Sequence, residues 1–337
     1  MNNLISQKNL ITDVPGLTIG EAHSEAAATG VTAIVFDRPT VASIATLGGA
    51  PGLRDTALLE PEMTVDHVDA ILLSGGSAFG LDAAGGAMAA LKEMGRGFEV
   101  GSVRVPIVPQ AILFDLLNGG NKDWGRMPPY WELGYQATKS FRIDVALGTA
   151  GAGYGATTAT LKGGLGSASI KTPSGFTVGA IVAVNAVGTA TIGDGPHFWA
   201  APYEHENEFG GLGLPKAISE DDLRPRLKTS AHRANTVIGC IATDARLTKG
   251  ECKRVALAAH DGLARAIRPA HTPMDGDTLF AAATGLKPLQ KGVMDLTELC
   301  IAAADVLARA IARGVYEAKA LPFAGVPPVW KDRFSTL

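Results

Sequence analysis

The sequence has little that would indicate a secreted, metal-binding or nucleic-acid-binding protein. It contains three cysteines, Cys240, Cys252 and Cys300, an odd number set in apolar or helical patterns. Such cysteines are typical of free thiols in a reducing compartment rather than of a disulfide framework or a metal site. There is no basic tract and the net charge is −3, so we expect neither a nucleic-acid partner nor an anionic membrane surface.

Targeting, membrane and cofactor signals are also missing. Residues 1–18 lack a basic start followed by an apolar core, so no secretory signal is expected. The most apolar stretch, 176–192, is too short and too polar to span a bilayer. No histidines have the spacing of a metal site, and no serine lies in a nucleophile elbow. We therefore predict a cytoplasmic, soluble protein without a metal or cofactor.

What the sequence does contain is enough apolar material for a large core. The chain has 337 residues, 46% of them hydrophobic and 19% charged, and its 41 glycines imply many tight turns. No repeat or linker divides it, so we predict one α/β domain over 1–337, with two sheets covered by helices. The pattern predicts strands at 30–36, 41–47, 68–73, 166–172, 176–185, 235–244 and 279–284, and helices at 81–94, 130–138, 247–267 and 296–318.

The segment 235–244 is the most informative of these strands. It follows the charged, non-periodic stretch 220–233, so Thr236 lies at the head of a buried strand after a polar approach. Threonine is common in strands, so this position alone does not identify a nucleophile. The alternative is that its hydroxyl attacks the carbonyl of Asn235 and the resulting ester is split by water. The freed α-amine of Thr236, with a pKa of about 7.7–8.0, would then be a general base for its own hydroxyl.

Three further polar side chains interrupt apolar or turn segments. Asn185 ends the strand 176–185, where it either pairs with neighbouring backbone or donates to a substrate oxygen. Asp275 and Asp277 flank a glycine before the strand 279–284. They either cap their own turn or orient a catalytic group. The glycine-rich loop 74–80 fits neither a P-loop nor a nucleophile elbow, and it either packs a helix closely or orients a small anion.

Taken together, these segments resemble the P1 group, peptidase family S58. This group includes L-aminopeptidase/D-esterases, β-peptidyl aminopeptidases and nylon-oligomer hydrolases. The matching stretches are 48–52, 73–82, 162–169, 182–188, 235–244 and 259–280, in the order of the family. The resemblance implies a four-layer αββα sandwich, similar to N-terminal-nucleophile hydrolases but with different connectivity. It also implies self-cleavage into 1–235 and 236–337 and a homo-oligomer of the processed units.

The resemblance also assigns roles to individual positions. Thr236 falls on the nucleophile, Lys162 on a lysine beside it, and Asn185 on the asparagine of the oxyanion hole. Asp275 and Asp277 match an acidic pair near the nucleophile. A lysine close to the threonine amine would favour the neutral, basic form of that amine, and the acidic pair would hold the ammonium formed when the amine takes the hydroxyl proton.

One departure concerns the subclass. The Asn235–Thr236 junction is similar to that of the nylon hydrolases, but Phe114 falls where those enzymes have a catalytically placed tyrosine. That hydroxyl is missing unless Tyr130 or Tyr154 replaces it. The substrate could therefore be an N-terminal residue of a small peptide, a β-peptide, an amino-acid amide or ester, or a 6-aminohexanoate oligomer.

These observations predict a self-cleaving N-terminal-threonine amide hydrolase that works through an acyl-enzyme. Two alternatives stay open at this point. One is an acyltransferase of the ornithine-acetyltransferase type, which passes the acyl group to an amine. The other is a non-catalytic protein of the same fold that binds a small anion.

Overall fold

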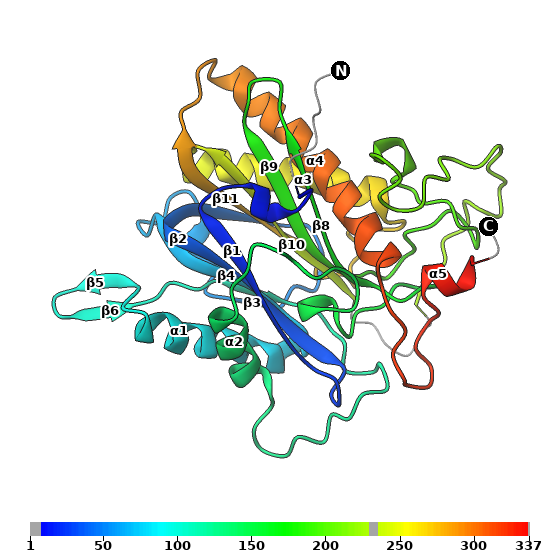
Figure 1. Cartoon of the computed structure of the whole chain (residues 1–337), viewed down its shortest axis with the longest axis horizontal. Helices are drawn as coiled ribbons and strands as arrows, with labels where there is room; N and C mark the ends of the chain where they lie inside the picture. Colours follow the sequence, from blue (N-terminus) through cyan, green and yellow to red (C-terminus); the bar gives the residue numbers. More distant parts are fainter. Residues whose placement is uncertain (1–7, 229–234, 336–337) are drawn as a thin grey trace.

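The computed structural model describes residues 8–228 and 235–335. Its largest element is a nine-stranded sheet with the order β3-β7-β4-β2-β11-β10-β9-β8, in which β1 also pairs with β2 (Figure 1). The strands are β1 Leu17–Ser24, β2 Thr29–Thr46, β3 Leu53–Arg54, β4 His67–Ser74, β7 Gln110–Ile112, β8 Gly164–Lys171, β9 Thr177–Asn185, β10 Thr236–Ala245 and β11 Thr278–Lys287.

Among the described residues, four longer α-helices and one short α-helix accompany the sheet. They are α1 Ala83–Glu93, α2 Tyr130–Lys139, α3 Lys249–Ala266, α4 Val293–Tyr316 and α5 Trp330–Arg333. A separate hairpin, β5 Phe98–Val100 with β6 Val103–Val105, projects from one side of the molecule (Figure 1). Within 8–228 and 235–335, no helix combines the length and the apolar character that crossing a membrane requires.

The long strand β2 corrects the prediction of separate strands at 30–36 and 41–47. The backbone remains extended through the exposed residues 37–39, and the register with β4 shifts between Val35 and Thr40. Residues 29–36 of β2 pair with β1, residues 41–46 pair with β11, and residues on both sides of the shift, 31–35 and 40–41, pair with β4. A charged and proline-bearing segment therefore makes a bulge rather than a turn. Consequently the two predicted sheets are one hydrogen-bonded sheet that forms two layers.

Buried side chains divide this sheet into an inner space and two outer faces. The inner cluster joins both layers and includes Ile34, Ile71, Ile238 and Phe280. One outer face packs on α1 and α2, and the other packs on α3 and α4. The order helix, strand, strand, helix confirms the predicted four-layer fold class. Because side chains alternate along a strand, Thr236 faces the same inner space as Ile238.

The start of α3 was predicted from its sequence and is confirmed. The Thr248 hydroxyl accepts a hydrogen bond from the Glu251 backbone N–H at 3.2 Å, and the Glu251 carboxylate accepts one from the Thr248 N–H at 2.7 Å. This capping box satisfies two N–H groups that a helix start otherwise leaves unpaired. It places α3 directly after β10, against the sheet layer that contains Thr236.

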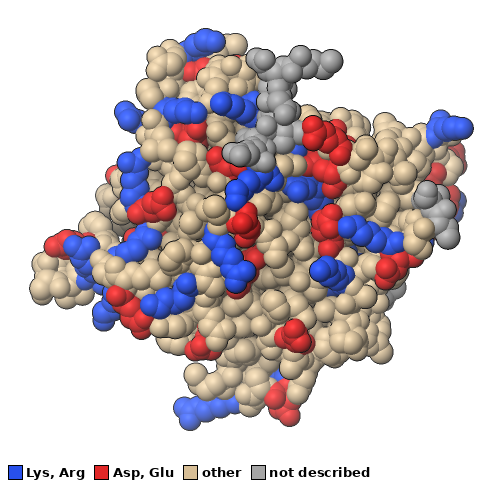
Figure 2. All heavy atoms as spheres, viewed as in Figure 1, with Lys and Arg blue, Asp and Glu red and all other residues tan. Residues whose placement is uncertain are grey.

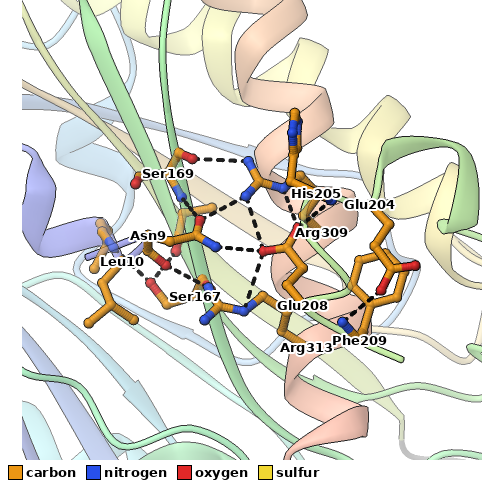
Figure 3. Close-up of polar contacts among 12 residues, drawn as sticks. Asn9, Leu10, Ser167, Ser169, Glu204, His205, Glu208, Phe209, Arg309 and Arg313 are labelled. Carbon is orange, nitrogen blue, oxygen red and sulfur yellow. Dashed lines mark hydrogen bonds and ion pairs between the residues drawn. The ribbon is translucent and has the colours of Figure 1, made fainter. Parts of the chain in front are cut away.

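A buried ionic network fixes α4 to the rest of the molecule (Figure 3). The fully buried Arg309 donates from Nε to Glu208 at 2.6 Å and from Nη1 to the Ser169 carbonyl at 2.9 Å. Arg313 pairs with the same glutamate at 3.5 Å, and Asn9 donates to it at 2.6 Å. One carboxylate therefore joins α4, the N-terminal segment and the loop that follows β9.

Removing that carboxylate should destabilise the protein strongly. In a Glu208→Ala variant, Arg309 and Arg313 would be left as buried charges without their anion, and the free energy of unfolding should fall by about 3–5 kcal/mol. Chemical denaturation would measure the change. The control is Glu99→Ala, which removes an exposed 2.9 Å pair with Arg104 and should cost no more than about 1 kcal/mol. Equal losses in the two variants would contradict this assignment.

Charged side chains on the surface form solvent-exposed pairs rather than a buried network. Figure 2 shows basic and acidic side chains interspersed over the visible face of the molecule. Pairs such as Lys331–Glu317 are half-exposed, with 45% and 36% of the two side chains accessible. Solvent and salt screen pairs of this kind, so their contribution to stability is small.

Candidate active site

The predicted nucleophile lies at the head of a completely buried strand. Thr236 is the first residue of β10, and all ten residues of that strand are buried. Its hydroxyl donates a hydrogen bond to the carbonyl oxygen of Asn235. The hydroxyl oxygen thus lies beside the one peptide carbonyl that self-cleavage would require it to attack.

A backbone N–H from the other side of the site polarises the same carbonyl. The N–H of Gly276 donates to the Asn235 oxygen at 2.9 Å, within a short parallel bridge between Asn235 and Asp275. Sequence reasoning gave Gly276 no role, because it appeared only as a turn residue between two aspartates. A Cβ at this glycine would lie 2.8 Å from the Thr236 hydroxyl oxygen, so only a glycine fits here.

Asp277 connects the nucleophile's strand to a histidine that the sequence analysis did not select. Its Oδ1 accepts from the N–H of Val237 at 2.9 Å. Its Oδ2 accepts from the His271 backbone N–H at 2.9 Å and contacts His271 Nδ1 at 3.0 Å. Burial lowers the pKa of His271, but the hydrogen bond and the charge of Asp277 outweigh burial and raise it above its usual value. The Asp277 carboxylate is therefore held in place against the backbone N–H of Val237, the residue that follows Thr236.

Asp275 makes the self-capping turn that was one of its two predicted roles. Its Oδ2 accepts from the N–H of Thr272 at 2.9 Å and from the Thr272 hydroxyl at 2.8 Å. Burial raises the pKa of Asp275, and the neighbouring charge of Asp277 raises it further. The Asp275 carbonyl also accepts from the N–H of Ala50, which anchors the turn to the loop after β2. The turn is therefore preorganised beside the Asn235–Thr236 bond.

Asn185 lies directly opposite Thr236 in the antiparallel pairing of β9 with β10. Its Nδ2 donates to the Phe114 carbonyl at 2.9 Å, and its Oδ1 accepts from the N–H of Thr157 at 3.1 Å. Pairing with neighbouring backbone, one of the two predicted alternatives, is thus observed. Because a primary amide carries two N–H donors, the bond to Phe114 uses only one of the two N–H groups of Asn185.

Lys162 is fully buried, as a lysine seldom is. Its ammonium nitrogen donates to the carbonyl of Gly163 at 2.9 Å and to that of Gly153 at 3.3 Å. Burial lowers its pKa to about 7, although the charge of Asp115 opposes the shift. Among the hydrogen bonds of the described residues none joins Lys162 to Thr236, so any influence of this lysine on the threonine is electrostatic.

A second lysine, Lys228, joins the same group of charges. Its ammonium nitrogen lies 3.0 Å from Asn185 Oδ1. Burial lowers its pKa to about 7, the charge of Asp275 opposes this shift, and the like charge of Lys162 adds to it. Sequence reasoning missed Lys228 because it lies in a polar, non-periodic stretch, where no local pattern distinguishes it from a solvated lysine.

A cavity of about 300 Å³ opens beside the junction. It is lined by apolar side chains and by charged or amide side chains, among them Phe114, Leu117, Val326, Asp115, Asn118, Lys228 and Asn235. The cavity therefore offers both an acidic and a basic group to a small ligand. No group of three or more histidine, cysteine or acidic side chains within the described ranges is arranged to hold a metal ion.

Neither proposed substitute for the hydroxyl missing at Phe114 reaches this cavity. Tyr130 is completely buried, and its hydroxyl has no hydrogen-bond partner among the described residues. Burial and the charge of Asp115 raise its pKa well above the usual value. Tyr154 stacks on His23 with ring centroids 4.4 Å apart and lines a different cavity. Phe114 thus enters the cavity without a phenol from either residue.

Comparison with known sequences identifies relatives that cover most of the chain. A family model described as "Peptidase family S58" matches residues 9–325. An uncharacterized aminopeptidase of Mycobacterium tuberculosis is 43% identical, covering 97% of this chain and 98% of that protein. A 6-aminohexanoate-oligomer endohydrolase of Kocuria is 28% identical, covering 82% of this chain and 76% of that protein.

Comparison with solved structures identifies the same fold. A β-aminopeptidase of Burkholderia superposes with a TM-score of 0.71 and 23% identity, covering 98% of this chain and 92% of that one. An L-aminopeptidase D-Ala-esterase/amidase of Ochrobactrum anthropi gives 0.70 and 19%, covering 100% and 95%. The latter is described as a variant of the Ntn hydrolase fold, in agreement with the fold class predicted from the sequence.

Proposed function

Because the chain belongs to peptidase family S58, we propose that it cuts itself between Asn235 and Thr236 and then hydrolyses short peptide-like amides with the exposed threonine. Family membership makes it an enzyme, an aminopeptidase or amide hydrolase, and removes the non-catalytic alternative. One observation carries the proposal. The Asn235 carbonyl oxygen accepts two hydrogen bonds, one from the hydroxyl of Thr236 and one from the N–H of Gly276.

Self-cleavage would proceed as an acyl shift from nitrogen to oxygen. The Thr236 oxygen bonds to the Asn235 carbonyl carbon and loses its proton, and the carbonyl oxygen becomes an oxyanion. The N–H of Gly276 already points at that oxygen and would stabilise the charge. The carbon–nitrogen bond then breaks, the proton goes to the departing amine, and water splits the ester to a carboxylate on Asn235 and a free hydroxyl on Thr236.

Turnover would use the amine released by this cut. The neutral amine of Thr236 takes the proton of its own hydroxyl, and the hydroxyl oxygen bonds to the substrate carbonyl carbon. The substrate carbon–nitrogen bond then breaks, the Thr236 ammonium returns the proton to the leaving amine, and water hydrolyses the acyl-enzyme ester. The free N–H of Asn185, directly opposite, would hold the oxyanion. The carboxylates of Asp275 and Asp277 would hold the ammonium form of the base. Lys162 would favour the neutral amine through its positive charge.

The substrate class follows from the cavity and from the relatives. A space of about 300 Å³ with acidic and basic groups suits a short, zwitterionic amide. The M. tuberculosis relative is named an aminopeptidase and the Kocuria relative a 6-aminohexanoate-oligomer endohydrolase, so small peptides and linear ω-amino-acid amides are both candidates. We also propose that the protein acts in the cytoplasm, because its three free cysteines are typical of a reducing compartment. We further propose that the processed units form a homo-oligomer.

Mass spectrometry of the freshly purified protein tests this proposal. We expect two polypeptides, 1–235 and 236–337, and hydrolysis of at least one substrate in a panel of α-dipeptide amides, β-dipeptides and 6-aminohexanoate dimer. Adding a free amine separates hydrolysis from acyl transfer, because an acyltransferase would give the amide of that amine as its main product. A chain that stays intact through prolonged incubation while the panel is hydrolysed would exclude the threonine amine as the base.

A further inference from the structure

Lys228 forms hydrogen bonds with the end of β9 and with the residues just after it, through both its backbone and its side chain. Its backbone N–H donates to the carbonyl of Val187 at 3.0 Å. Its ammonium nitrogen lies 3.0 Å from the Asn185 side-chain oxygen and 3.4 Å from the Asn185 carbonyl oxygen. A partly buried lysine that folds back onto an amide in this way gives up most of its contact with water, so the contact has a cost that its hydrogen bonds must offset.

These contacts help to determine which way the Asn185 amide faces, together with the hydrogen bond from its Nδ2 to the Phe114 carbonyl at 2.9 Å. Its oxygen accepts from two donors, the ammonium of Lys228 and the backbone N–H of Thr157. A flipped amide would present its NH₂ group to both donors and would lose both hydrogen bonds. We propose that Lys228 is a positioning residue that keeps the NH₂ group of Asn185 turned toward the oxygen that reacts at Thr236. The inference rests on the oxyanion role of Asn185 in the proposed function.

The attachment of Lys228 does not depend on the peptide bond that would be cut. Its partners Asn185 and Val187 belong to the portion 1–235, as do Lys228 itself and Thr157, the other donor to the Asn185 oxygen. The turn just before it is held by Arg226, which pairs with Asp221 at 2.8 Å and with Asp194 at 3.2 Å. The lysine would therefore remain against Asn185 after self-cleavage and could act in every later turnover.

The charges around Lys228 have opposing effects on its pKa, but the side chain can donate a hydrogen bond to Asn185 in either protonation state. Asp275 and Asp115 favour its charged form, whereas burial and Lys162 favour the neutral amine. Both forms carry N–H groups, so both donate to the Asn185 oxygen. An arginine also donates in this geometry, but a methionine of similar length does not.

Steady-state kinetics of the processed enzyme test the inference. Lys228→Met should lower kcat by about 10- to 100-fold and change KM by less than about 3-fold, because the lost contact acts on the oxyanion rather than on the bound substrate. Lys228→Arg should recover most of kcat. Lys216→Met, which changes an exposed lysine on the same loop, should behave like the wild type and is the matched control.

A double-mutant cycle with Asn185→Ala separates positioning from general structural support. If Lys228 acts through Asn185, Lys228→Met should cause less than about a 3-fold further loss of kcat in the Asn185→Ala background. Independent losses in the two variants, an unchanged kcat in Lys228→Met, or a rise in KM alone would each overturn the inference. These outcomes are distinct from failure of the proposed function, which would appear in the wild-type protein as no cut and no hydrolysis.

Discussion

We expect that replacing Thr236 with alanine will leave the chain uncut and remove amide hydrolysis. The alanine variant has no hydroxyl beside the Asn235 carbonyl, so the acyl shift has no acceptor oxygen. Even if another protease cut the chain there, the new terminus would carry an amine but no nucleophile. Loss of a nucleophile of this kind typically lowers kcat by about 10⁶-fold, which would make turnover undetectable in an ordinary assay.

Mass spectrometry and substrate hydrolysis, measured on the same preparation, report both effects. The control is Thr236→Ser, which keeps a hydroxyl in the same place and should still cut and turn over, more slowly because serine lacks the branched β-carbon that restricts χ1. The alanine variant should have the circular dichroism spectrum of the uncut wild-type fold. Cleavage at 235–236 in the alanine variant would show that another group attacks this bond.

Adding one methyl group at Gly276 should slow self-cleavage by at least about 10²-fold. The new Cβ would lie 2.8 Å from the Thr236 hydroxyl oxygen and 2.8 Å from the Ala50 carbonyl oxygen, well inside the about 3.5–4.0 Å at which non-bonded atoms attract each other. Relief of these contacts must move the hydroxyl or the Gly276 N–H away from the Asn235 carbonyl. Loss of one oxyanion donor alone costs about 10²- to 10³-fold in rate.

The time course of chain cutting after synthesis measures this loss. The matched control is Gly250→Ala, since a Cβ at this exposed glycine in the first turn of α3 meets nothing within 4 Å. That variant should cut at the wild-type rate and gain up to about 1 kcal/mol of stability, because alanine favours a helix more than glycine does. A Gly276→Ala variant that cuts as fast as Gly250→Ala would remove Gly276 from the reaction.

Much of the fold could be predicted from local patterns. The strand 235–244 and the helix that follows it combine a β-branched apolar run with a capping box, and both signals lie within a few residues of one another. The head of β10 at Thr236 was predicted for the same reason. The continuity of β2 was not predicted, because the segment Asp37–Arg38–Pro39 resembles a turn and the pairing with distant strands lies on either side of it.

The site was less accessible to sequence reasoning because its contacts connect distant segments. Gly276 acts through a backbone N–H, which no side-chain pattern reveals. Lys228 and His271 gain significance only from their contacts with Asn185 and Asp277, and each contact depends on tertiary packing. Lys162 was selected through family resemblance, and its complete burial could not be inferred from the glycine-rich sequence around it.

The place of β10 in the sheet has a consequence for the enzyme once it is cut. β10 pairs with β9 from the portion 1–235 along eight residues and with β11 from 236–337 on its other side. The two products would thus form a heterodimer in which β9 of one product pairs with β10 of the other within a continuous sheet. Each product would contribute part of the hydrophobic core, so neither could form that core alone. Such a pair melts and reassembles as a bimolecular system, so recovery from denaturation would depend on protein concentration although the uncut precursor folds as one molecule.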